Sequence, residues 1–181
     1  MLTRNFYEFL LNQICNKGFN LYYLTGVDGA EVTVSSITGN TNYGALLDGA
    51  MTKLNLGTNF NNQFYGVVIG TGTTAPTLDD IFIENQITTG LSVANPDRAY
   101  VSRTDEAISM SATYTLKNTT GADITITEIG LVLNKQTASG TTTNAQHTLL
   151  VDRTVLSNPV TVPAGETKNL VYTVKFTYPT A

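Results

Sequence analysis

The sequence predicts a mainly β protein, an antiparallel β-sandwich of immunoglobulin-like or jelly-roll-like type with an N-terminal helix and hairpin extension. The second half of the chain holds four runs rich in Ile, Val, Thr and Tyr, separated by turn-rich segments. The last run alternates apolar and polar residues from Leu170 to Thr177, as expected for a strand with one buried face. The first half mixes helical and β-prone patterns. We therefore expect residues 1–65 to form the extension and residues 66–181 the sandwich.

The composition excludes several classes of protein. Of the 181 residues 13% are charged and 41% hydrophobic, so solubility depends on hydroxyl and amide groups. The net charge of -4 argues against direct nucleic-acid binding, which normally needs a basic surface. A single cysteine, Cys15, and a single histidine, His147, exclude an intrachain disulfide and a Cys/His zinc site within one chain. No run has the roughly 20 apolar residues of a membrane span, and the N-terminus lacks a signal-peptide pattern.

The N-terminal residues carry apolar side chains at helical spacing. Asn5 is the predicted N-cap, with Glu8 three residues later, and Lys17 and Gly18 end the helix. Its apolar face either packs on the sandwich of the same chain, which is the simpler interpretation, or docks on a neighbouring subunit. The side chains of this possible docking helix are Phe6, Phe9, Leu10 and Ile14.

Two short β-prone runs follow, residues 19–24 and 31–37, and the turn between them, residues 26–29, predicts a hairpin. A helical pattern interrupted by two glycines covers residues 44–54. Residues 64–69 then predict a buried strand.

The stretch GVVIGTGTTAPTLDD, residues 66–80, joins the extension to the sandwich and has the glycine spacing of a nucleotide loop. A Walker loop needs a lysine directly after its glycines, and a dinucleotide fingerprint needs a βαβ unit; neither is present. We therefore interpret Gly70 and Gly72 as shaping a sharp turn. Pro76 holds the preceding residue extended, and Thr77 with Asp80 predicts the cap of a two-turn helix that runs through Glu84.

Residues 87–104 show little periodicity and predict a loop or extended arm. The strands of the sandwich are predicted at residues 108–116, 124–133, 149–156 and 170–176, with turns at 118–122, 134–147 and 157–167. In the second of these strands the apolar residues switch from even to odd positions at Thr127 and Glu128, which indicates a β-bulge. Because a carboxylate turned toward the core needs a partner, we predict an ion pair between Glu128 and Arg153 on the next strand.

No catalytic, cofactor-binding or metal-binding residues are predicted, and the chain is not expected to be an enzyme. The nearest candidate for acid chemistry or Ca²⁺ binding is the cluster of Asp79, Asp80 and Glu84, but helix capping explains Asp80 and the EF-hand spacing is absent. The predicted structural residues are Glu128, Arg153, Gly70, Gly72, Pro76 and Asp80.

Three segments in this order, GVVIGTGTTAPTLDD, NTTGADITITEIGLV and LLVDRTVLSNPVTVPAGETKNLVYTVKFTYP, resemble a motif series found in virion structural proteins of tailed bacteriophages. The shared pattern is a Gly-Thr-Gly turn before P-x-x-D-D, a TEIGL strand, an R-x-x-L strand followed by Pro, and a V-x-A-G-E-T turn into a Tyr-rich strand. It covers residues 66–178. Its fold-forming positions match Ile129, Gly130, Arg153, Pro163, Gly165 and Tyr172.

The resemblance implies a non-enzymatic virion component that is assembled in the host cytoplasm and has no cofactor. We expect a head-associated role, in capsid decoration or cementing or in head-fibre anchoring, with a neck or tail protein as the alternative. The expected partners are capsid, neck or tail subunits and further copies of the chain, in a closed homo-oligomer of trimeric or higher symmetry, without direct nucleic-acid or membrane contact. An alternative of another class is a carbohydrate-binding sandwich, although the chain has no tryptophan for a sugar-stacking face.

Overall fold

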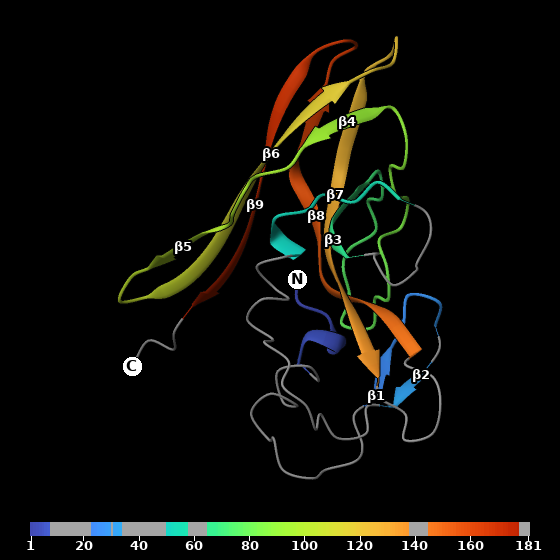
Figure 1. Ribbon diagram of the computed structural model, residues 1–181, viewed down its shortest axis with the longest axis vertical. Coiled ribbons are helices and arrows are strands. Elements are labelled where there is room, and N and C mark those ends of the chain that lie inside the picture. The colour runs from blue at the N-terminus through green and yellow to red at the C-terminus, as the bar shows by residue number, and fades with distance from the viewer. Residues whose placement is uncertain (8–22, 30, 34–49, 58–64, 138–144, 178–181) are drawn as a thin grey trace.

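The protein is described by a computed structural model that covers residues 1–7, 23–29, 31–33, 50–57, 65–137 and 145–177. Within these ranges the strands pair antiparallel in sheets, which confirms the predicted mainly β fold class (Figure 1). No helix in the described ranges has the length and apolar character needed to cross a membrane.

Two sheets make up the sandwich. The three-stranded sheet has the order β3–β7–β8, with bounds β3 Gly66–Gly70, β7 Ile124–Thr137 and β8 Ala145–Val162. In the four-stranded sheet β6 lies in the centre, β9 pairs with it along one edge, and β4 and β5 follow one another along the other. The bounds of these strands are β4 Leu91–Ala94, β5 Tyr100–Arg103, β6 Ala107–Asn118 and β9 Thr167–Thr177.

The main hydrophobic core lies between the two sheets. Tyr114 and Leu116 of β6 pack there with Ile126 and Leu131 of β7, and all four are almost completely buried. The predicted alternation of β9 is confirmed, since Leu170, Tyr172 and Val174 are buried and Phe176 is half-buried, while Val171, Thr173, Lys175 and Thr177 are exposed.

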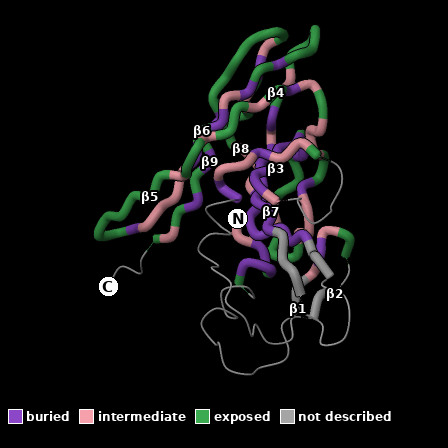
Figure 2. Tube along the Cα trace, in the orientation of Figure 1, coloured by how far each residue is buried: buried purple, intermediate pink, exposed green. Residues whose placement is uncertain are grey.

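The three-stranded sheet is covered on its other face as well. Val68, Val132 and Leu150 form a second small core with Ile83 of the segment between β3 and β4, residues 71–90, which is called the loop below. A Cβ on Gly130 would lie 2.8 Å from Cγ2 of Ile83, so this strand needs glycine where the loop packs on it. Every residue of β3 is buried in consequence (Figure 2).

The predicted hairpin of the extension is confirmed in its described part. β1 (Tyr23–Thr25) pairs antiparallel with β2 (Glu31–Thr33). Gly29 in the connecting turn has a φ of 77°, a conformation that glycine adopts without strain. Of the helical pattern at residues 44–54 the described part is helical only at residues 50 and 51, and Leu54 instead forms a β-bridge with Val67.

The predicted capping role of Asn5 is wrong. The helix begins at Arg4, and the buried Asn5 side chain pairs with the backbone of Thr25, donating to its carbonyl (2.8 Å) and accepting from its N–H (2.9 Å). Phe6 is buried in the sandwich of its own chain and stacks on Phe176, with 5.6 Å between ring centroids. Phe9, Leu10 and Ile14 of the possible docking helix lie outside the described residues, as do Cys15 and the predicted helix end. The division of the chain at residue 65 stays a prediction.

The prediction of a loop or extended arm over residues 87–104 missed two strands, since the segment contains β4 and β5. Residues 95–99, which include Pro96, face only three residues of β6, so one edge strand is split in two by a bulge. The strands are too short and too polar to show a period of their own. Their hydrogen bonds come from pairing with β6, which the local sequence does not reveal.

Two predicted turn segments are also too long. β7 extends to Thr137, and β8 begins at Ala145 and runs to Val162, past Pro159. The proline is tolerated because it lies where the ladder is irregular: Glu128 pairs with Val155, and Ile126 pairs with Val160.

The predicted helix after Thr77 is absent, and residues 78–79 form only a turn. The cap contacts themselves do form, since the Thr77 N–H donates to Asp80 Oδ2 (2.9 Å) and the Thr77 hydroxyl donates to Oδ1 (2.7 Å). Asp80 also pairs with Arg153, and the chain continues across the sheet instead of coiling.

Candidate functional site

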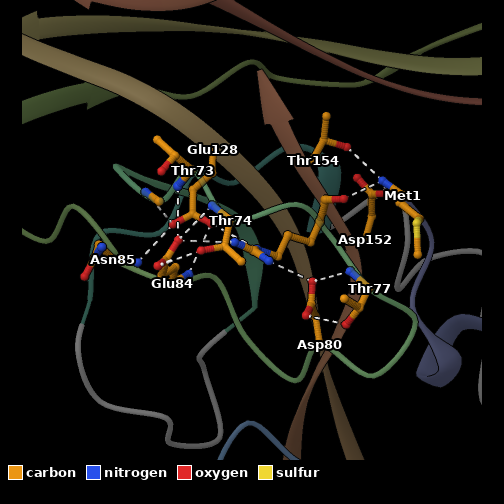
Figure 3. Close-up of polar contacts among 12 residues, drawn as sticks. Met1, Thr73, Thr74, Thr77, Asp80, Glu84, Asn85, Glu128, Asp152 and Thr154 are labelled. Atoms are coloured by element: carbon orange, nitrogen blue, oxygen red, sulfur yellow. Dashed lines mark hydrogen bonds and ion pairs between the residues drawn. The ribbon is translucent and has the colours of Figure 1, made fainter. Parts of the chain in front are cut away.

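Four charged residues from three separate segments meet beneath the loop that follows β3. They are Arg153 of β8, Glu128 of β7, and Asp80 and Glu84 of the loop, and together they are called the Arg153 network below (Figure 3). In Figure 3 Glu84 and Glu128 lie close together on one side of the network, and Asp80 lies on the other beside Thr77.

A register irregularity between β7 and β8, in which residues 156–159 of β8 face the single residue Thr127 of β7, places Glu128 in this network. The ladder with β8 shifts register between Ile126 and Glu128, which confirms the irregularity predicted from the switch in apolar positions. Ile126 packs in the main core, whereas the Thr127 hydroxyl donates to the Gly72 carbonyl (2.8 Å) and Glu128 contacts the loop. Glu128 is 0% exposed. The sequence predicts that it turns toward the core between the sheets, but it lies under the loop on the other face of β7.

A second irregularity places Arg153. Leu131 pairs with Asp152 but Val132 pairs with Leu150, so Val151 has no partner in the ladder. Val151 fills the main core, and Arg153 is turned to the face of the sheet that the loop covers. The two irregularities bring Glu128 and Arg153 to the same face.

The predicted ion pair between Glu128 and Arg153 is confirmed. Arg153 Nε lies 3.0 Å from Glu128 Oε2, and Nη1 lies 2.8 Å from Asp80 Oδ2. Nη2 is 3.7 Å from Glu84 Oε2 and makes no hydrogen bond. The Arg153 side chain is 4% exposed and that of Glu128 is 0% exposed, so this pair lies out of water, where such contacts are strong and a missing partner is costly.

Backbone N–H groups complete the coordination of Glu128. Oε1 accepts from Gly72 (3.0 Å) and Asn85 (2.9 Å), and Oε2 accepts from Glu84 (3.1 Å) in addition to Arg153. Four donors thus occupy the acceptor positions of this carboxylate. Glu128 ties both ends of the loop to β7.

The two glycines of the Gly-Thr-Gly turn are needed for this close approach. A Cβ on Gly70 would lie 2.5 Å from the Asn85 carbonyl oxygen and 2.6 Å from Glu128 Oε1. A Cβ on Gly72 would lie 2.6 Å from the Glu84 Cβ and nearer still to Glu128 Oε1. Both glycines serve backbone packing around Glu128.

Asp80 and Glu84, the two loop acids of the Arg153 network, have pKa values below the ordinary range. Burial alone would raise the pKa of Asp80, but hydrogen bonds from Arg153 and Thr77 outweigh it and lower the pKa. Hydrogen bonds from the Thr74 backbone and hydroxyl, and from the Thr73 backbone, lower the pKa of the exposed Glu84. For Arg153 burial opposes the charge, yet its bonds to Asp80 and Glu128 raise the pKa. All three groups are therefore fixed in their charged forms at neutral pH.

A second buried polar pair lies next to the network on the opposite face of β8. The Tyr172 hydroxyl donates to Asp152 Oδ2 (2.6 Å), and burial followed by the Asp152 charge raises the pKa of Tyr172. Asp152 Oδ1 lies 3.0 Å from the amino group of Met1, which also donates to the Arg153 carbonyl and the Thr154 hydroxyl. These contacts hold residues 1–3 against the edge of β8.

The predicted carboxylate cluster divides between two arginines. Asp79 forms an exposed pair with Arg4, 2.7 Å between Nη2 and Oδ1, whereas Asp80 and Glu84 belong to the Arg153 network. Within the described ranges no three His, Cys, Asp or Glu residues are grouped so that they could hold a metal ion. Pro76 is half-buried and follows the exposed residues 73–75, and its effect on the conformation of Ala75 stays a prediction.

Glu84 and Asn85 as partners of Glu128, and the pair of Asp152 and Tyr172, were not predicted from the sequence. No periodic signal marks the first two, because they contribute backbone groups of an irregular loop. Asn118 was not predicted either; it is fully buried and closes the β6–β7 turn by donating to the carbonyls of Ala122 (2.7 Å) and Val162 (2.9 Å). An asparagine followed by Thr-Thr-Gly at the end of a strand is the signal that could have identified it.

Fold and site together define an antiparallel β-sandwich in which a buried ion network fastens a glycine-containing loop to one sheet. Comparison of the chain with protein-family models, with curated proteins and with solved structures gave no match.

Proposed function

We propose that this chain is a structural component of a tailed-bacteriophage virion, associated with the head, and that it acts through symmetric protein–protein contacts. The observation that carries the proposal is the convergence of the motif series in space. The Gly-Thr-Gly turn, the P-x-x-D-D segment, the TEIGL strand and the arginine of R-x-x-L supply Gly72, Asp80, Glu128 and Arg153 to one network. Pieces that lie far apart in the sequence thus form one structural unit.

The last piece of the series has a structural role as well. In the V-x-A-G-E-T turn Gly165 has a φ of 72°, and the Glu166 N–H donates to the Pro163 carbonyl (3.0 Å). The Glu166 carbonyl accepts from the Asn118 N–H (2.9 Å), which joins the β8–β9 turn to the end of β6. Each motif of the series therefore fixes backbone geometry, as the resemblance implies for fold-forming positions.

The chemistry of the network supports a structural role over a catalytic one. A general acid or base needs a pKa near the working pH and access to a substrate. Glu128 has neither an exposed atom nor an unoccupied acceptor position, and the pKa values of Asp80 and Glu84 are lowered by their donors. Asp80 and Glu84 therefore keep their charge and are not poised to accept a proton near neutral pH.

The test is to locate the protein in particles. Particles purified from cells that produce this chain are washed in high salt and labelled with a gold-conjugated antibody against it, with antibody pre-absorbed on recombinant protein as the control. We expect label on the head. Label on the neck or tail would replace the head assignment with the alternative position, and washed particles without label would contradict a virion role.

A further inference from the structure

The two sheets have four outer edges, and three of them are covered or interrupted. At the β8 edge the Thr3 N–H donates to the Val151 carbonyl (3.1 Å), and Leu2 forms a bridge with Asp152. At the β3 edge Val67 exchanges backbone hydrogen bonds with residues 53 and 55, and the Ile87 N–H donates to the Ile69 carbonyl (2.8 Å). The edge formed by β4 and β5 is split by the bulge around Pro96.

The fourth edge, the outer edge of β9, differs from the others. β9 pairs with β6 over eleven consecutive residue pairs without a bulge, and it has no proline. No described segment pairs with its other side. Proteins usually shorten, bend or cover such an edge, because a long regular row of free N–H and C=O groups is a template for another strand. An uncovered edge of this length indicates an interaction surface.

We propose that the β9 edge pairs antiparallel with β9 of a second copy of this chain, about a two-fold axis at Val171. The inference deepens the assembly role proposed above, but it rests on the strand itself. Val171 is 60% exposed, the most exposed large aliphatic side chain of β9, and the pairing would place it against Val171 of the second copy. β-Branched residues directly opposite one another stabilise a strand pair.

The side chains of β9 fit this register. Residues of the inner face lie opposite inner-face residues of the second copy, Leu170 opposite Tyr172, so the apolar face continues across the contact. The two lysines stay apart, because Lys175 lies opposite Thr167 and Lys168 opposite Val174 of the second copy. A slip by one residue would place Lys168 opposite Lys175 of the second copy. It would also place the core-facing residues of one copy opposite the solvent-facing residues of the other. Charge and periodicity therefore select against the slipped register.

A two-fold contact of this kind gives a dimer or, combined with another interface, an assembly with dihedral symmetry. It therefore changes the sequence-based expectation of a trimer or higher ring to an even number of copies.

The first experiment is light scattering on the purified chain at about 100 μM, where a contact with micromolar dissociation constant is populated. We expect twice the chain mass or an even multiple, and half that mass for Val171→Lys, which puts two ammonium groups opposite one another. Val101→Lys is the matched control: Val101 is a 47% exposed valine on the other edge of the same sheet, and this variant should keep the parent mass. A parent chain that is a single copy, or a Val171→Lys variant of unchanged mass and circular dichroism, would overturn the proposal.

The second experiment fixes the register by oxidation in a Cys15→Ser background. Val171→Cys should form an intermolecular disulfide, because opposed Cα atoms in a strand pair lie about 5 Å apart. Thr173→Cys, on the same face, should not, because the equivalent cysteine of the second copy lies about 13 Å away along the strand. Cross-linking of the second variant but not the first would overturn the Val171 register. Since neither experiment uses virion components, failure of the edge contact is distinguishable from failure of the virion assignment.

Discussion

The two sheets of the sandwich differ in how they treat their polar groups. The three-stranded sheet is buried on both faces, its described edges are bridged by other segments, and its charges are paired beneath the loop. The four-stranded sheet has one wet face, an exposed β5 and an outer β9 edge with which no described segment pairs. β5 with the adjoining ends of β6 and β9 extends away from the body (Figure 2). The first sheet is organised for stability, whereas the second offers backbone and side chains for contact. Substitutions should therefore affect different properties in the two sheets.

The largest effect is expected from Arg153→Met, which leaves Glu128 buried without its cation. Loss of one partner of a buried ion pair typically costs about 3–5 kcal/mol. Urea unfolding should show that loss in the free energy of unfolding. Arg4→Met removes an exposed pair with Asp79, whose side chains are 61% and 72% exposed, and should cost no more than about 1 kcal/mol. Equal losses of unfolding free energy in the two variants would show that the buried Arg153 network contributes no more to stability than an exposed ion pair.

A smaller effect is expected from Gly72→Ala. The new methyl group would overlap Glu84 and Glu128, and overpacking of this kind typically costs about 1–3 kcal/mol. Gly121→Ala is the matched control, since a Cβ there meets nothing within 4 Å. In thermal unfolding we expect Gly72→Ala to have a lower melting temperature than the parent and Gly121→Ala to have a melting temperature near that of the parent. A stable Gly72→Ala protein would contradict the tight fit of the loop around Glu128.

Asp80→Asn should weaken the dependence of stability on pH. Because the pKa of Asp80 is lower in the folded protein than in the unfolded chain, its contribution is present above the unfolded pKa and is lost as pH falls through the folded pKa. The parent should therefore lose free energy of unfolding below about pH 5, and Asp80→Asn should lose less over the same range. Asp97→Asn, at an exposed position in the β4–β5 connection, should behave as the parent does. Identical acid titrations of the parent and Asp80→Asn would remove Asp80 from the network's energetics.

The smallest effect on stability is expected on β5. Tyr100 and Val101 are 64% and 47% exposed, and substitutions at such positions usually change the free energy of unfolding by less than about 0.5 kcal/mol. Tyr100→Ser and Val101→Thr should therefore unfold at the parent's urea midpoint. A loss above about 1 kcal/mol for either would mean that β5 belongs to the stabilised part of the molecule.

The sequence predicted structure correctly where the order of apolar and polar residues within one segment determines it. The alternation of Leu170 to Phe176 predicts β9. The switch of apolar positions at Thr127 and Glu128 predicts an irregularity at this place in the ladder and, with it, the need for Arg153, although the extra residues lie on β8 and not on β7. The prediction failed where pairing between distant segments decides the structure. β4 and β5 are strands because β6 lies beside them, and Thr77 begins a turn instead of a helix at a place where Asp80 is bound to Arg153. Glu84 and Asn85 reach Glu128 through the path of a loop, which no local pattern encodes.

The division between a stabilising sheet and a contact sheet is tested most directly by urea unfolding at two protein concentrations a hundredfold apart. If β9 edges pair only in folded chains, the parent's midpoint rises with concentration by mass action. Arg153→Met should lower the midpoint at both concentrations and keep the rise, whereas Val171→Lys should abolish the rise and unfold at the parent's low-concentration midpoint. A concentration-independent parent, or a Val171→Lys variant as unstable as Arg153→Met, would contradict the division.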